Sequence, residues 1–207
     1  MILVGQYDSP YVRRVGVTLG VLGFAFEHDT RSVFADFDSM RTVNPLGRIP
    51  SLILPDGTTL IDSAAILDWL DQSVGPEKAL LPPSGLSRRQ ALQRIALATG
   101  TIDKVMAAAY ERRIRPAAYR WPDWIARCRA QAEGGLAALA AQSWPADARL
   151  DQAWITTACM IRYVRLADPG LLPAGRHPAL DAVSARCEAL PAFKTTYPAD
   201  YVVPAAG

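Results

Sequence analysis

The chain has 207 residues, of which half are hydrophobic and a fifth are charged, as in an ordinary globular protein. The formal net charge of +2, from 22 basic and 20 acidic residues, is too small to indicate a nucleic-acid or anionic-membrane partner. No apolar run approaches the ~20 residues of a membrane span, and no signal-peptide pattern precedes Asp8, so we expect a cytoplasmic protein.

Short apolar runs alternate with helical patterns over the first 75 residues. Apolar side chains at helical spacing predict amphipathic helices, and short apolar runs bounded by turn residues predict strands. The expected strands are 2–4, 26–30, 51–54 and 58–61, and the expected helices are 10–22, a weak one at 36–43, and 64–74. Pro55-Asp56-Gly57 predicts the turn of a hairpin. This order predicts an open sheet with helices packed on it.

The second part of the chain has a different pattern, because helix-breaking residues are followed by helical periodicity alone. The expected helices are 86–115, 124–141, 150–164 and 178–190, and no strand is expected among them. We therefore expect an α/β domain over residues 1–76, a linker over 77–86 and an all-helical domain over 87–207.

The three cysteines are Cys128, Cys159 and Cys187. Their number is odd, no CxxC motif occurs, and neither His28 nor His177 stands at metal-ligand spacing from them. We expect three buried, reduced thiols, no disulfide framework and no bound metal.

Ser9-Pro10 stands at the predicted turn from the first strand into the first helix. Serine is a good N-cap and proline suits the first helical position, so local stabilisation alone accounts for the pair. The same geometry can bind an anion, because a helix N-terminus offers free N–H donors beyond the carboxyl end of a strand. The local sequence leaves both interpretations open.

Two further segments have the same ambiguity. Pro50 can simply begin an edge strand, but a cis Ile49-Pro50 bond would leave the Ile49 backbone free to pair with an extended peptide. Asp62 and Ser63 can simply cap the third helix. They can equally hold an amino-acid head group, with Ser63 donating to its carboxylate and Asp62 accepting from its ammonium.

Three segments, SPYVRRV, NPLGRIPSLILPDG and LIDSAAILDWLD, together resemble the glutathione transferase family in order and spacing. The segments ATGTIDKVMAAAYERR and ITTACMIRYV are similar to helices of bacterial members. The resemblance implies a thioredoxin-like N-terminal domain followed by an all-α helical-bundle C-terminal domain, glutathione as cosubstrate, and a homodimer. It also implies that Ile49-Pro50 is cis.

The resemblance also implies roles for individual residues. Ser9 would donate a hydrogen bond to the glutathione sulfur, with Tyr7 as an alternative hydroxyl. The glutathione-binding residues would be Arg48, Ile49, Asp62 and Ser63. Asp103 matches a position that reaches the partner subunit's glutathione in some members. A hydrophobic acceptor would lie against Tyr11, Met106, Tyr110 and Arg113.

Two departures from the family pattern limit these expectations. The residue at the sulfur position is serine and not cysteine, which disfavours mixed-disulfide chemistry. The usual capping box is replaced by Arg149-Leu150-Asp151-Gln152, so Asp147 or Asp151 would cap the helix.

We expect a glutathione S-transferase that adds the thiolate to a hydrophobic electrophile. The alternatives are glutathione-dependent peroxidase, isomerase or dehalogenase activity, or a non-catalytic interaction protein with the same fold.

Overall fold

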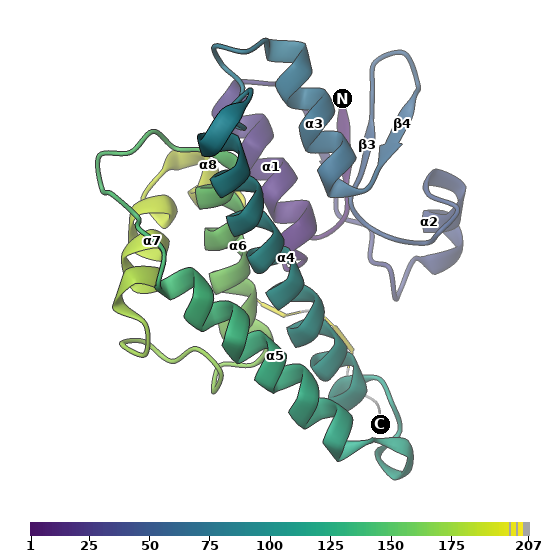
Figure 1. Ribbon diagram of the computed structural model, residues 1–207. Helices are drawn as coiled ribbons and strands as arrows, with labels where there is room; N and C mark the ends of the chain where they lie inside the picture. The colour runs from purple at the N-terminus through teal and green to yellow at the C-terminus, as the bar shows by residue number, and fades with distance from the viewer. Residues whose placement is uncertain (199, 202, 205–207) are drawn as a thin grey trace.

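The N-terminal part of the chain forms a four-stranded mixed sheet in the computed structural model, which describes residues 1–198, 200–201 and 203–204 (Figure 1). The strands are β1 (Ile2–Val4), β2 (Glu27–Asp29), β3 (Ser51–Ile53) and β4 (Thr59–Ile61), in the order β2-β1-β3-β4. β1 pairs in parallel with β2, and β3 is antiparallel to both β1 and β4. The hairpin predicted at Pro55-Asp56-Gly57 therefore joins β3 to β4.

Helices α1 (Pro10–Leu22) and α3 (Ser63–Val74) pack against each other on one side of the sheet, and the short α2 (Phe37–Val43) stands apart from them (Figure 1). Their apolar faces and the sheet enclose one core, which contains Leu3, Val12, Val15, Leu19, Leu52, Ile66, Leu67 and Leu70. The alternation of strand and helix predicted for this region is confirmed.

The remainder of the described chain is helical. Its elements are α4 (Gly85–Arg113), the 3₁₀ helix η1 (Ala117–Tyr119), α5 (Pro122–Ala140), α6 (Gln152–Ala167), α7 (Pro178–Glu188) and α8 (Pro191–Thr195). α6 lies at the centre, because it packs against α1, α4 and α7 and is buried on nearly all sides. The expected fold class, a thioredoxin-like α/β part followed by a helical bundle, is confirmed.

Several element boundaries differ from the sequence predictions. α4 begins at Gly85, so Gly85 and Leu86 belong to the helix and not to the linker. α5 begins at Pro122, because proline suits the first turn of a helix. Asp151 caps α6 by accepting hydrogen bonds from the Ala153 and Trp154 amides at 2.9 and 3.0 Å. The five-residue α8 escaped prediction because it is too short to show a period.

All three cysteines are buried and none forms a disulfide. Within the described part of the chain, no helix is both long and apolar enough to cross a membrane.

Candidate functional site

Two neighbouring cavities open where α1 begins, between the loop before β3 and the α4 helix. The first, here called the polar cavity, has a volume of about 320 Å³ and is lined by Arg14, Asn44, Asp62, Ser63 and Thr99 among others. The second, here called the apolar cavity, has about 420 Å³ and is lined by Ser9, Phe34, Met106, Tyr110, Tyr163 and others. The cavities share four lining residues, which are Tyr11, Arg48, Ile49 and Asp103.

Ser9 is the N-cap of α1 and lines the apolar cavity. Its Oγ accepts a hydrogen bond from the Val12 amide at 3.5 Å, which is long for such a bond. No acceptor for the Ser9 hydroxyl proton occurs among the described residues. The hydroxyl can therefore donate outward, beside the Tyr11 amide of the first helical turn, since Pro10 has no N–H and the Val12 amide is bonded to Ser9.

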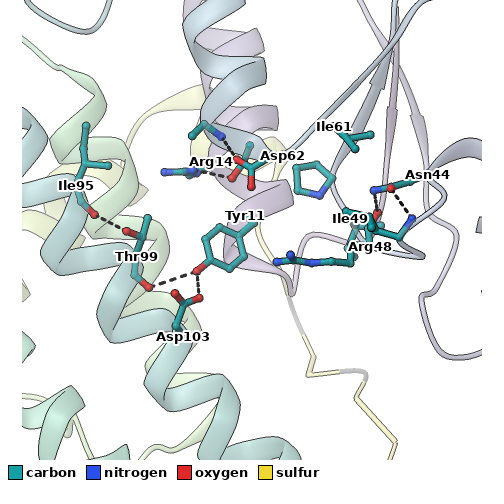
Figure 2. A pocket seen from close by; sticks show the side chains of 14 residues that line it. Tyr11, Arg14, Asn44, Arg48, Ile49, Ile61, Asp62, Ile95, Thr99 and Asp103 are labelled. Carbon is teal, nitrogen blue, oxygen red and sulfur yellow. Dashed lines mark hydrogen bonds between the residues drawn. The ribbon is translucent and has the colours of Figure 1, made fainter.

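The loop before β3 is fixed from within by Asn44. The buried Asn44 side chain donates to the Arg48 carbonyl at 2.7 Å and accepts from the Leu46 amide at 3.0 Å (Figure 2). The Ile49-Pro50 peptide bond is cis, as predicted. In the described chain the Ile49 amide and carbonyl have no backbone hydrogen-bond partner. Both groups can therefore form hydrogen bonds with a ligand.

Asp62 and Ser63 begin α3 at the wall of the polar cavity. Asp62 has φ +67°, a left-handed conformation that is costly for a residue other than glycine. Its carboxylate accepts from the Ala64 amide at 2.7 Å. The buried Ser63 hydroxyl accepts a 2.6 Å hydrogen bond from the guanidinium of Arg14, which lies beside Asp62 in Figure 2.

Tyr11 and Asp103 form the wall between the two cavities. The Tyr11 hydroxyl on α1 donates to the Asp103 carboxylate on α4, and it lies 3.3 Å from the Thr99 carbonyl oxygen (Figure 2). Burial, followed by the hydrogen bond and charge of Asp103, raises the pKa of Tyr11. Tyr11 therefore remains a protonated phenol that joins α1 to α4. Asp103 is the residue that the family resemblance places near the glutathione of a partner subunit. Within this chain, its carboxylate accepts a hydrogen bond from Tyr11.

Comparison with known proteins identifies the family. A family model described as glutathione S-transferase, N-terminal domain, matches residues 3–78. The chain is 30% identical to the uncharacterized GST-like protein YibF of Escherichia coli (strain K12) over 176 residues, which cover 82% of this chain and 86% of that protein. The chain belongs to the glutathione S-transferase family.

Two further proteins are similar to this transferase-family chain over nearly its whole length. A glutathione S-transferase of Methylobacterium radiotolerans, solved in complex with glutathione sulfonate, has a TM-score of 0.90 at 31% identity, covering 100% of this chain and 98% of that one. A probable maleylacetoacetate isomerase of Drosophila melanogaster is 27% identical over 205 residues, covering 95% of this chain and 81% of the relative.

Two residues that the sequence suggested for the candidate site, Tyr7 and Arg113, do not line either cavity. The Tyr7 ring stacks on His28 with 4.0 Å between ring centroids and rests against Gly16, where a Cβ would lie 2.7 Å from the ring. Arg113 donates to the Val203 carbonyl at 2.8 and 3.1 Å, and its guanidinium lies over the Tyr201 ring. It holds the C-terminal segment against the apolar cavity and does not itself face an acceptor.

The sequence analysis missed several residues that line the two cavities, among them Arg14, Asn44, Tyr163 and Tyr201. Arg14 and Asn44 stand inside the motifs SPYVRRV and NPLGRIPSLILPDG, so the motifs themselves could have suggested them. The two tyrosines had no local signal, because they enter the cavity from α6 and from the segment after α8. Among the described residues, no group of three or more His, Cys, Asp or Glu side chains could hold a metal ion.

Proposed function

We propose that this protein is a glutathione transferase that binds glutathione in the polar cavity and adds its thiolate to a hydrophobic electrophile in the apolar cavity. One observation carries the proposal. A cavity whose lining includes Arg14, Asp62 and Ser63 shares a wall with a cavity lined mainly by aromatic and apolar residues, and the capped N-terminus of α1 stands at that wall.

The residues of the polar cavity match the groups of a γ-glutamyl tripeptide. The open Ile49 backbone can pair with the cysteinyl backbone as an added strand does. Ser63 and the first amides of α3 suit a carboxylate, and the exposed Asp62 side chain suits the neighbouring ammonium. Arg48 lines both cavities and can pair with the glycine carboxylate.

Ser9 would hold the sulfur as a thiolate. A free cysteine thiol has a pKa of about 8.5, and lowering it by about two units requires roughly 2.7 kcal/mol of preference for the anion. A helix N-terminus contributes about 0.3–2 kcal/mol and a hydrogen bond to a charged group about 1.5–3 kcal/mol. Together these two contributions suffice without a protein base, and Ser9 acts as a hydrogen-bond donor and not as a nucleophile.

The reaction with an activated aryl chloride then proceeds by addition and elimination. The thiol proton leaves to water, and the sulfur anion attacks the ring carbon that bears chlorine. A carbon–sulfur bond forms, the carbon–chlorine bond breaks, and chloride departs with its electron pair. The phenols of the apolar cavity stay protonated, since burial raises the pKa of Tyr110 to about 12.

Two measurements test the proposal. The protein is expected to be retained on immobilised glutathione and to conjugate glutathione to a chloronitrobenzene, followed by absorbance of the thioether product. No retention together with no turnover would reject the proposal and favour a non-catalytic interaction protein with this fold.

A second candidate is glutathione-dependent isomerisation, which the similarity to the Drosophila relative supports. It uses the same thiolate, which adds to an unsaturated acceptor and leaves again after bond rotation, so glutathione is not consumed. Turnover of an unsaturated acceptor with no loss of glutathione would favour this reaction over conjugation. A peroxidase would consume a peroxide instead, and a dehalogenase would release halide without accumulating the thioether product.

Assembly and domain division belong to the same proposal. We propose a cytoplasmic homodimer, as the family resemblance implies, acting in detoxification of electrophiles. Residues 1–76 would bind glutathione, and both parts of the chain would line the acceptor cavity, to which residues 87–207 contribute Met106, Tyr110 and Tyr163 among others. Mass measurement in solution tests the dimer.

A further inference from the structure

The end of the α4–α5 pair projects from the body of the molecule and is largely apolar at its surface (Figure 1). Residues 114–121, here called the aromatic tip, join the two helices and include the 3₁₀ helix η1. Tyr119 is 72% exposed, more than any other large hydrophobic residue in the described chain. Trp121 is 60% exposed, Ile114 is 38% exposed, and residues 115–118 are exposed between them. Such a cluster of exposed aromatic and apolar residues marks a binding surface.

The aromatic tip is held in this conformation by Glu111 in the last turn of α4. Glu111 is buried, and its carboxylate accepts from the Trp121 amide at 3.0 Å and from Arg115 Nε at 2.9 Å. The Arg120 guanidinium donates to the Arg115 carbonyl at 3.0 Å. The Trp121 ring stacks on the Trp124 ring with 6.4 Å between centroids. These bonds fix the backbone that presents Tyr119 and Trp121 to the outside.

Positive charge is concentrated around the same residues. Residues 111–127 contain five arginines and two acidic residues, a net charge of +3, whereas the whole chain has +2. Of the two carboxylates, Glu111 is buried against Arg115, and Asp123 lies in the first turn of α5, where the helix N-terminus offsets its charge. Within the described chain, no carboxylate lies at ion-pair distance from Arg120 or Arg127. A partner of the aromatic tip is therefore expected to be both apolar and anionic.

We propose that the aromatic tip binds the surface of an anionic lipid bilayer, with Tyr119 and Trp121 among the headgroups and Arg120 beside lipid phosphates. Tyrosine and tryptophan favour this depth because each combines an apolar ring with a polar hydrogen-bonding group. Arginine is a strong hydrogen-bond donor to phosphate. A projecting end needs no partner of complementary shape, which favours a bilayer over a folded protein.

Binding of the aromatic tip to lipid goes beyond the proposed function and requires no glutathione. The two are compatible in space, because Tyr110, which lines the apolar cavity, lies about one helical turn before Ile114 on α4. A bound tip would hold the acceptor cavity close to a bilayer, in which hydrophobic compounds dissolve.

Sedimentation with lipid vesicles tests the proposal. The probes are vesicles of phosphatidylcholine alone and vesicles of equal parts phosphatidylcholine and phosphatidylglycerol. The wild-type protein is expected to sediment with the anionic vesicles only, and less so at high salt, since salt screens charges. Trp121→Ser is expected to weaken this binding about tenfold, as for the loss of one large apolar side chain from the interface. Arg120→Gln is expected to weaken it about fivefold, as for one cation near an anionic membrane, whereas Arg120→Lys keeps it.

Leu86→Ser is the matched control, because Leu86 is 58% exposed but lies at the opposite end of α4. It is expected to leave vesicle binding unchanged. Absence of wild-type binding to anionic vesicles, equal binding to both kinds of vesicle, or equal losses in Trp121→Ser and Leu86→Ser would overturn the proposal. A Trp121→Ser protein with a smaller mass in solution than the wild type would also overturn it, because the tip would then lie between copies of the chain. None of these outcomes affects the proposed function, which is tested with glutathione.

A second measurement follows the tryptophan fluorescence of the protein on vesicles. Phosphatidylglycerol with brominated acyl chains is expected to quench the wild-type fluorescence, because bromine quenches an indole ring that enters the interface. Trp121→Phe, which keeps an aromatic ring at the tip, is expected to bind the vesicles but to lose most of the quenching. Unquenched wild-type fluorescence, or the same quenching in Trp121→Phe, would contradict the placement of Trp121 in the lipid.

Discussion

Arg13 of α1 and Glu188, the last residue of α7, are joined by two parallel hydrogen bonds of 2.8 and 2.6 Å. The remaining donors of the guanidinium reach the Phe193 and Thr196 carbonyls at 3.2 and 3.1 Å. One buried side chain of the first helix therefore ties the α/β part to the last two helices. Since α1 also carries Ser9 and Tyr11, this tie helps to fix the position of the site.

Glu188→Gln is expected to destabilise the protein by about 2–3 kcal/mol, because it leaves the buried Arg13 charge unpaired. The value lies below the about 3–5 kcal/mol of a fully buried pair, because the Glu188 side chain is 21% exposed. Urea unfolding measures it. The control is Glu133→Gln, which removes the exposed Arg176–Glu133 pair and is expected to cost less than about 1 kcal/mol. Equal effects of the two substitutions would show that the Arg13–Glu188 pair does not stabilise the packing of α1 against the last two helices.

Ser9→Ala is expected to raise the pKa of bound glutathione by about one to two units, since it removes a hydrogen bond to the sulfur anion. Turnover at neutral pH falls in proportion to the thiolate fraction, while glutathione affinity changes little. Ultraviolet absorbance of the thiolate against pH gives the pKa. Ser9→Thr keeps a hydroxyl and serves as the control. If the titration of Ser9→Ala matches that of the wild type, the Ser9 hydroxyl does not donate to the sulfur.

Met106→Trp is expected to separate the two cavities functionally. Met106 lines the apolar cavity and not the polar one, so a larger side chain there takes up acceptor space and leaves glutathione binding unchanged. The kcat/KM for a bulky aryl acceptor is expected to fall roughly tenfold. Met106→Leu, of similar volume, is the control. A loss of glutathione affinity in Met106→Trp would contradict this division, because it would show that glutathione also reaches into the apolar cavity.

The buried cysteines give a pH-dependent prediction. Burial raises the pKa of the Cys159 and Cys187 thiols to about 12. Above about pH 8.5 an unfolded thiol loses its proton while the native one keeps it. The native state then binds more protons, so the free energy of unfolding falls as pH rises, by up to about 1.4 kcal/mol per pH unit for each thiol.

Urea unfolding between about pH 8 and pH 9 tests this slope, because the tyrosines of the unfolded chain ionise mainly near pH 10. Replacement of both Cys159 and Cys187 by alanine is expected to flatten the slope over that range. A native protein whose cysteines react with a thiol reagent as fast as those of the urea-unfolded chain would contradict the burial of these thiols.

The sequence by itself determined what depends on neighbouring residues. Ser9-Pro10 predicted the start of α1, and Pro55-Asp56-Gly57 predicted the hairpin, because caps and turns are satisfied within a few residues. Helical spacing of apolar residues likewise predicted the helical part of the chain, apart from the short α8. The family resemblance then added the cis Ile49-Pro50 bond and the roles expected of the loop around it.

The tertiary structure alone decided which side chains meet. Nothing in the local sequence distinguishes Arg13 from Arg14. In the structure, Arg13 forms an ion pair with Glu188 of α7, whereas Arg14 donates a hydrogen bond to Ser63 beside a cavity. Tyr7 turns toward His28 and away from the site, while Tyr163 and Tyr201 enter it from the opposite end of the chain. These outcomes have no local pattern, because the free energy of burying a charge or a ring depends on partners that only the packed chain brings into contact.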